Sequence, residues 1–100
     1  MTPSYSLHLT SAAEQDLSEA IEWYDEQQPG LGDDFLRNID AIFANIARNP
    51  LQFPQLHRTV RRAFVRRFPY GVFFLIEDHR IEVLAVFHVR RDPTAWQSRL

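Results

Sequence analysis

The sequence contains no cysteine and no lysine, only three glycines, and no long apolar run. Without cysteine the chain can build neither a disulfide framework nor a thiolate metal site, which fits a reducing cytoplasm. No segment approaches the roughly 20 apolar residues that a membrane helix needs. The first ten residues also lack the basic stretch and apolar run of a secretory signal. These absences predict a cytoplasmic protein that makes no contact with a membrane.

Missing motifs exclude several kinds of site. The chain has no glycine-rich loop to hold a phosphate and no nucleophile elbow, and its acidic residues lack the spacing of a calcium loop. His8, His57 and His79 stand alone, without metal-ligand spacing. We therefore expect no metal and no cofactor. A length of 100 residues and a hydrophobic content of 45% predict one folded domain, residues 1–100.

The charges are distributed unevenly along the chain, although the net charge is only −2. Residues 1–40 hold nine acidic residues and one arginine, whereas residues 41–100 hold ten arginines and four acidic residues. Every cation is arginine, the residue best suited to a bidentate grip on phosphate or carboxylate. A GC-rich genome would account for the missing lysine but not for this clustering. The asymmetry indicates that one end of the molecule meets an anionic partner.

Two stretches have the periodicity of amphipathic helices. Ser11 is expected to cap the first helix, with Glu14 at the three-residue spacing of a capping box. Residues 29–32 break the chain, the acidic pair 33–34 should begin the second helix, and Pro50 should end it. The short break predicts an antiparallel helical hairpin.

Strands are predicted on both sides of this hairpin. Residues 5–10 and 59–68 alternate in polarity, the latter with arginine at the polar positions. Residues 71–77 and 81–89 are nearly all apolar, as in central strands that are covered on both faces. Residues 51–57, between the hairpin and these strands, should form a loop.

The resulting order is β-α-α-β-β-β, followed by a short helix or frayed tail that opens at Asp92-Pro93. The helical hairpin has to cover one face of an antiparallel sheet, because nothing else in the chain can bury its apolar stripe. The other face of the sheet is then open, and Arg62, Arg66 and Arg90 are expected on it or at its edge. The sequence thus predicts an α+β fold.

The strongest local feature is the segment 60–70, in which four arginines are interleaved with aromatic residues. Strand alternation would send Arg62 and Arg66 to one face and Arg61 and Arg67 to the other. Arginine beside aromatic rings is typical of nucleic-acid binding. The same charges would equally suit an edge strand, where they prevent aggregation between sheets. Both interpretations stay open.

A second feature is His88, which is followed closely by Arg91. Metal-independent RNA cleavage needs a base for the ribose 2′-hydroxyl, cations for the developing charge and an acid for the leaving oxygen. His88 with Arg62, Arg67 and Arg91 could supply part of this set, although a single histidine at a strand end is more often structural. Trp96 could stack on a base or a partner side chain, but closing the core is its more common role.

Motifs along nearly the whole chain resemble the RelE/ParE toxin superfamily. They are Ala13, Asp16, Leu17 and Trp23-Tyr24 on the first helix, Pro29-Gly30-Leu31-Gly32 with Phe35, Asn49-Pro50 with Phe53-Pro54, Val60-Arg61-Arg62, Arg67-Phe68-Pro69-Tyr70, and His88-Val89-Arg90-Arg91-Asp92-Pro93 with Trp96 and Arg99. No single motif is decisive, but their order and spacing together are specific. The fold that the resemblance implies agrees with the β-α-α-β-β-β order.

The resemblance also implies a biological setting. Members of the superfamily are cytoplasmic toxins encoded beside an antitoxin that wraps over them, which implies a hetero-oligomer with a cognate antitoxin. The RelE branch cuts messenger RNA on the ribosome, whereas the ParE branch blocks DNA gyrase. The fold alone does not choose between these targets.

Details of the sequence favour the ParE branch. Residues 67–70 and 88–93 look like the ParE pattern, and residues 51–57 have no lysine where RelE-type nucleases usually carry it. Trp96 stands where those nucleases often have Tyr or His, and it cannot act as an acid or base. The first hypothesis is therefore a non-catalytic inhibitor of gyrase or another target.

Two alternatives remain. One is a ribosome-dependent endoribonuclease that uses His88, Arg67 and Arg91, and the other is a regulatory member that only binds its antitoxin. The residues expected to bind the target or the antitoxin are the arginines of the C-terminal half and the nearby tryptophan: Arg61, Arg62, Arg66, Arg67, Arg90, Arg91, Trp96 and Arg99.

Overall fold

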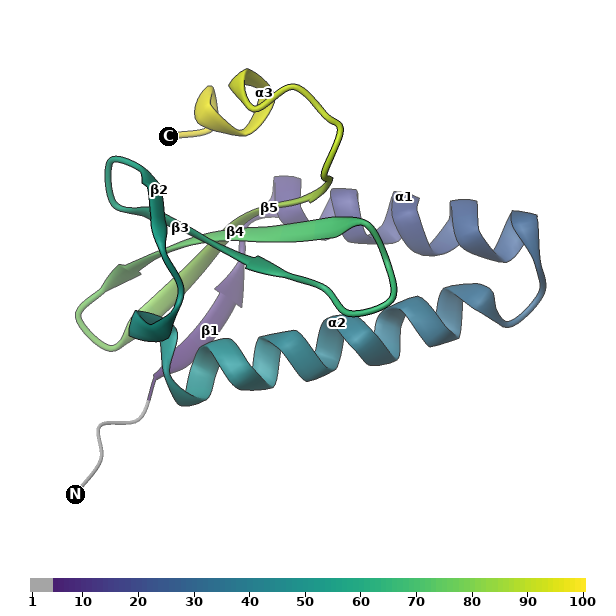
Figure 1. Cartoon of the computed structure of the whole chain (residues 1–100), viewed down its shortest axis with the longest axis horizontal. Coiled ribbons are helices and arrows are strands. Elements are labelled where there is room, and N and C mark those ends of the chain that lie inside the picture. Colours follow the sequence, from purple (N-terminus) through teal and green to yellow (C-terminus); the bar gives the residue numbers. More distant parts are fainter. Residues whose placement is uncertain (1–4) are drawn as a thin grey trace.

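The computed structural model describes residues 5–100, so the first four residues of the predicted domain, and part of the segment used to argue against a secretory signal, lie outside the described residues. A helical hairpin lies on one side of a twisted sheet, and a short C-terminal helix lies on the other (Figure 1). In chain order the elements are β1 (Ser6–Leu9), α1 (Ser11–Gln27), α2 (Leu31–Arg48), the 3-10 helix η1 (Pro50–Gln52), β2 (Gln55–His57), β3 (Val60–Phe64), β4 (Tyr70–Glu77), β5 (Arg80–His88) and α3 (Thr94–Gln97). The predicted α+β fold is confirmed.

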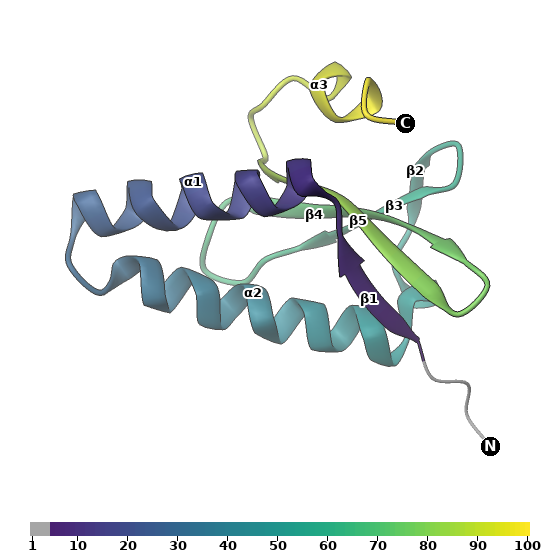
Figure 2. The ribbon, with the colours of Figure 1, turned by 180° about the vertical axis from the view of Figure 1, so that it is seen from behind.

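The described strands form one sheet in the order β1-β5-β4-β3-β2. Neighbouring strands from β2 to β5 are antiparallel, as expected, but β1 pairs with β5 in parallel, which the prediction of an antiparallel sheet missed. Figure 2 shows β1 running beside β5 at this edge. Parallel strands need a long connection, and the 70 residues between β1 and β5, which include the helical hairpin, provide it.

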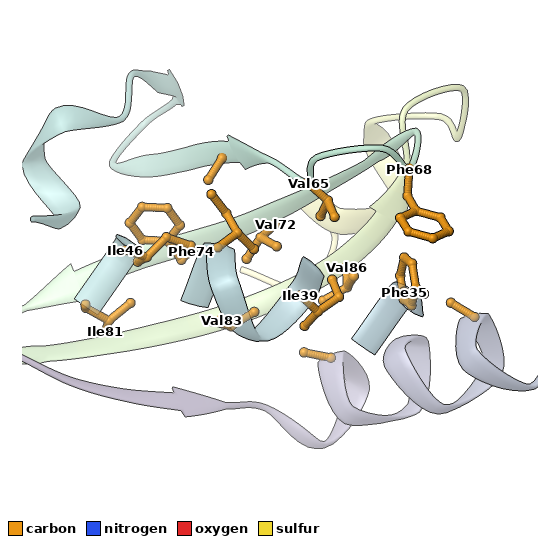
Figure 3. Close-up of a cluster of buried hydrophobic side chains, with 14 of the residues drawn as sticks. Phe35, Ile39, Ile46, Val65, Phe68, Val72, Phe74, Ile81, Val83 and Val86 are labelled. Carbon is orange, nitrogen blue, oxygen red and sulfur yellow. The ribbon is translucent and has the colours of Figure 1, made fainter. Parts of the chain in front are cut away.

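The main core lies between the hairpin and the sheet (Figure 3). Phe35, Ile39 and Ile46 line the buried side of α2 and meet Phe74 and Val83 from the central strands. These residues carry the apolar spacing that predicted the helix and the two central strands. Their burial fixes the hairpin on this face, because an amphipathic stripe gains stability only where it leaves water.

The opposite face of the sheet is partly covered by α3, where an open face was expected. Trp96 is buried and stacks on Phe73 with ring centroids 4.8 Å apart. It closes a second, smaller core formed with residues of the three central strands: Val60, Phe73, Leu84, Ala85 and Phe87. Trp96 therefore takes the role that is more common for such a residue, the closing of a core. We call this side of the sheet the α3 face.

The start of α1 differs from the expected capping box. Thr10, one residue before Ser11, is the N-cap, and its hydroxyl accepts a hydrogen bond of 3.1 Å from the Ala13 amide. Ser11 is the first helical residue and is exposed. Glu14 therefore lies one position too late to close a box with the true cap. The sequence offered two adjacent hydroxyl residues, and the pairing of β1 decided which of them is extended.

Replacing Thr10 with alanine should lower the free energy of unfolding by about 1 kcal/mol, because the Ala13 amide loses its side-chain acceptor. The matched change Ser11→Ala should leave stability within about 0.5 kcal/mol, since Ser11 caps nothing. Urea unfolding followed by circular dichroism measures both. A larger loss for Ser11→Ala than for Thr10→Ala would contradict this assignment of the cap.

The second helix begins at Leu31, earlier than the acidic pair 33–34. Gly30 is its N-cap in the left-handed conformation, and the Gly32 amide donates a 2.8 Å hydrogen bond to the carboxylate of Asp25 on α1. A Cβ at position 32 would lie 2.7 Å from Asp25 and from the carbonyl of Ile21. Glycine is therefore required where the two helices approach, and Asp25 caps the neighbouring helix. At its other end α2 stops at Arg48, just before Pro50, as predicted.

The segments before and after β3 also differ from expectation. Residues 51–57 are not only loop, because η1 and the short edge strand β2 occupy most of them. The predicted strand 59–68 ends at Phe64, because the chain turns back at residues 65–69 to enter β4. Arg67 has a φ of 69° in this turn, and Pro69 has no amide to continue a ladder.

The pairing of β4 with β5 contains an irregularity that strand alternation alone would not reveal. Phe73 pairs with Ala85 and Phe74 with Val83, so Leu84 is an extra residue in β5. Leu84 and Ala85 consequently both lie on the α3 face, and Phe87 does as well. Without this bulge, alternation from Val83 would send Phe87 toward the helical hairpin. The bulge therefore places the aromatic ring of Phe87 on the α3 face.

Candidate functional site

A pocket of about 140 Å³ opens on the α3 face, between the ends of β3, β4 and β5 and the start of α3. Its floor is aromatic, and its rim carries exposed apolar side chains and two arginines. The lining residues are Leu56, Arg62, Phe64, Gly71, Phe73, Phe87, His88, Val89, Arg91, Pro93 and Trp96. We call it the arginine pocket.

Arg62 and Arg91 reach the arginine pocket from strand β3 and from the segment after β5. The Arg62 guanidinium carbon lies 4.3 Å from the centre of the Phe64 ring, and that of Arg91 lies 3.9 Å from the centre of the Phe87 ring. Stacking on an aromatic face holds a guanidinium in place and leaves its N–H edges available. Arg62 thus lies on the side of the sheet opposite the hairpin, as expected, and lines the arginine pocket.

His88 also lines the arginine pocket, and it borders a neighbouring hollow of about 220 Å³ that Arg91 shares. Its Nδ1 accepts a 3.1 Å hydrogen bond from the backbone amide of Arg90, and its ring meets Tyr70 edge to face. A backbone amide can only donate, so in the neutral ring the proton sits on Nε2. The imidazole lone pair is then occupied by the protein itself.

The third residue of the nuclease hypothesis is elsewhere. Arg67 lies on the turn between β3 and β4, over the Phe68 ring, and is not among the residues that line the arginine pocket. Arg66 shares this turn, and Arg90 lies in the turn after β5; all three are exposed. The structure therefore brings His88 and Arg91 together with Arg62 but leaves Arg67 apart. The expectation that Arg66 and Arg67 alternate across a strand was wrong, because the strand has already ended.

Two other arginines expected to bind a partner are engaged inside the protein. Arg61 donates a 2.6 Å hydrogen bond to the carbonyl of Phe53. Arg99 forms a bidentate ion pair with Asp16, at 2.6 and 3.0 Å, and also donates to the carbonyl of Leu84. The contacts of Arg99 and the buried Trp96 hold the C-terminal segment on the sheet.

Asp16 is the residue whose role the sequence did not indicate. It is almost fully buried in α1 and accepts a further hydrogen bond of 3.0 Å from the Val86 amide. Its hydrogen bonds hold the pKa of the Arg99 guanidinium above its ordinary value. Burial raises the pKa of Tyr70, with the negative charge of Asp16 adding to the effect, and burial likewise raises that of Tyr24. A single aspartate among nine acids in the N-terminal forty residues gave no local sign of burial.

Residues 5–100 contain neither a metal-binding cluster nor a helix that could span a membrane. No group of three or more histidine, aspartate or glutamate side chains there is placed to hold a metal ion. None of the helices there combines the length and the hydropathy needed to cross a bilayer.

A helical hairpin on one face of a mixed sheet, with arginines on the other face, is the architecture of the RelE/ParE class of small toxins. Two solved structures support this assignment of the fold. The chromosomal ParDE toxin–antitoxin system from P. aeruginosa matches with a TM-score of 0.77 and 20% identity, covering 87% of this chain and 98% of that one. The toxin–antitoxin complex RelBE2 from Mycobacterium tuberculosis matches with a TM-score of 0.59 and 22% identity, covering 85% and 98%.

Sequence comparison gives the family. The model of the ParE toxin of the type II toxin–antitoxin system parDE matches residues 7–93. Toxin ParE2 from two strains of Mycobacterium tuberculosis is 30% identical over 95 residues, which cover 94% of this chain and 90% of that protein. The chain therefore belongs to the ParE toxin family, which confirms the predicted resemblance.

Proposed function

We propose that this ParE-type toxin arrests growth by binding its target, DNA gyrase, without performing chemistry, and that a cognate antitoxin neutralises it in a cytoplasmic hetero-oligomer. The observation that supports binding over RNA cleavage is the engagement of His88. Its Nδ1 already accepts the Arg90 amide, so the one histidine at the arginine pocket lacks the lone pair that a general base needs. Arg67 does not line that pocket, and Trp96, which does, is buried.

The proposal of an antitoxin partner has separate support. Both solved relatives are described as toxin–antitoxin assemblies. The described chain also offers two surfaces of unlike chemistry: an acidic hairpin, and a sheet face with uncompensated arginines. An antitoxin segment that folds on binding needs a large interface to offset its ordering cost. We expect it to use both the hairpin and the sheet.

The test is growth of bacteria that express the chain from an inducible promoter, with and without the product of the neighbouring antitoxin gene, followed by two assays on purified protein. Gyrase supercoiling should be inhibited, and primer extension on ribosome-bound messenger RNA should show no cuts. His88→Ala should keep the growth arrest, as should the matched change of the exposed His79→Ala. Codon-phased cuts that disappear in His88→Ala would instead establish the nuclease, the second candidate that the grouping of His88, Arg62 and Arg91 favours.

A further inference from the structure

The two arginines of the arginine pocket have no anionic partner within the protein. Among residues 5–100, neither the Arg62 nor the Arg91 side chain joins an ion pair or donates a hydrogen bond. By contrast, the Arg61 side chain donates a hydrogen bond, and the Arg99 side chain both donates hydrogen bonds and forms an ion pair. The Nε–H of Arg62 is buried without any acceptor. No residue that lines the pocket carries a carboxyl group. Two cations thus face one cavity without an ion-pair partner among the described residues, although Asp16 and Glu19 line the neighbouring hollow that Arg91 also borders.

The surroundings of these cations limit what can occupy the cavity. The floor is aromatic, and the rim includes Leu56, Phe64 and Val89, three of the exposed large hydrophobic residues of the chain. A volume of about 140 Å³ is well below the roughly 300–1,000 Å³ typical of sites for small molecules and cofactors. One amino-acid side chain fits such a space, and its apolar neighbours would cover the rim.

From this juxtaposition we propose that the arginine pocket binds the carboxylate of one glutamate or aspartate side chain, carried by a peptide segment with apolar residues on both sides. The stacked guanidiniums present their N–H edges to a planar two-oxygen acceptor, which is the arrangement of a bidentate arginine–carboxylate pair. The inference rests on the proposed function, because the antitoxin is the partner that would bring this segment.

A nucleic acid is less well suited to the same cavity. Phosphates along a strand are recognised by an open, positively charged groove that follows the backbone. Here the charge is confined to two positions above an apolar floor, and no arginine besides Arg62 and Arg91 lines the pocket. Arg66, Arg67 and Arg90, for example, are exposed on turns outside it. We therefore expect phosphate groups to bind the pocket more weakly than a carboxylate does.

The test is a titration of the purified, 15N-labelled full chain, followed through the Trp96 indole N–H and the Arg62 Nε–H signals. The probe is the peptide acetyl-Leu-Glu-Leu-amide, with acetyl-Leu-Gln-Leu-amide, inorganic phosphate and a uridine tetranucleotide as comparisons. We expect the glutamate peptide to move both signals and the glutamine peptide to bind at least about tenfold more weakly, since the charge-assisted hydrogen bonds are lost. Phosphate and the tetranucleotide should move them less than the glutamate peptide does.

Variants locate the effect. Arg62→Gln and Arg91→Gln should each weaken binding of the glutamate peptide by about tenfold or more. Arg66→Gln removes the same charge outside the pocket and should bind as the unaltered protein does. Arg91 is exposed, so its variant carries the test if Arg62→Gln does not fold.

Three results would overturn the proposal: no movement of the Trp96 signal with the glutamate peptide, equal binding of the glutamine peptide, or stronger binding of the tetranucleotide. Growth arrest plays no part in this experiment. A toxin that inhibits gyrase and is neutralised, yet fails the titration, would therefore refute the pocket and leave the proposed function standing. Conversely, peptide binding by a chain that does not arrest growth would support the pocket and refute the proposed function.

Discussion

Phe35→Ala is expected to lower the free energy of unfolding by about 4 kcal/mol. Phe35 is fully buried where the second helix faces the turn between β3 and β4. Its ring centroid lies 5.0 to 5.2 Å from those of Tyr24, Phe68 and Tyr70 (Figure 3 shows Phe35 facing Phe68). Truncation removes the ring and leaves a cavity among aromatic side chains that cannot collapse easily.

A small domain is stable by only about 5–15 kcal/mol, so this loss would remove between about a quarter and most of the stability. The control is Phe64→Ala, which removes the same atoms from a side chain that is 55% exposed and should change stability by no more than about 0.5 kcal/mol. Urea unfolding of both variants, with the slope of the transition checked against the unaltered protein, measures the difference. Equal losses for the two variants would show that the core is not centred where the structure places it.

Asp16→Ala is expected to cost about 3 kcal/mol, at the lower end of the range for breaking a buried ion pair. The lower end applies because the Arg99 side chain keeps 22% of its surface exposed, whereas that of Asp16 keeps only 6%. The change would leave the guanidinium without its carboxylate and the Val86 amide without its acceptor. It would also release the C-terminal segment that holds Trp96 on the sheet.

The control for this change is Asp34→Ala, which breaks the ion pair of Asp34 with Arg37 on the surface of α2. Exposed pairs contribute little, so the loss there should stay below about 1 kcal/mol. A double-mutant cycle of Asp16→Ala with Arg99→Ala isolates the interaction itself and should give a coupling energy above about 1 kcal/mol. A coupling near zero would mean that the two side chains meet without stabilising the fold.

Much of the fold could be predicted because its signals are local. The apolar spacing on both helices, the break at residues 29–32 and the apolar runs of the two central strands each lie within a short window. They led to the hairpin, the order of most elements and the correct fold class. The parallel pairing of β1, the edge strand β2 and the covering of the second face by α3 were not predicted. The other errors fell at boundaries, where a neighbouring element decided the outcome. Asp25 on α1 caps α2, and the pairing of β1 selects Thr10 over Ser11 as the cap.

The candidate site was predicted less completely than the fold. The sequence indicated His88, Arg62 and Arg91, and the structure brings these three to one pocket. The sequence also grouped Arg67 with these three residues, and it predicted that Arg61 and Arg99 bind a partner. Those assignments depended on where a strand ends and on which carbonyl or carboxylate lies near each arginine in space. The residues next to an arginine in the sequence predict neither of these.

The sequence by itself determined the two long helices, the two central strands and the sign of the charge on each half, because periodicity and composition act over neighbouring residues. The tertiary structure alone decided which arginines are available. The bulge at Leu84 turns Phe87 to the α3 face, and Phe87 in turn supports Arg91. The pairing of Asp16 with Arg99 joins residues 83 positions apart and neutralises one cation within the protein. Such outcomes depend on register and on long-range contact, which no local pattern encodes.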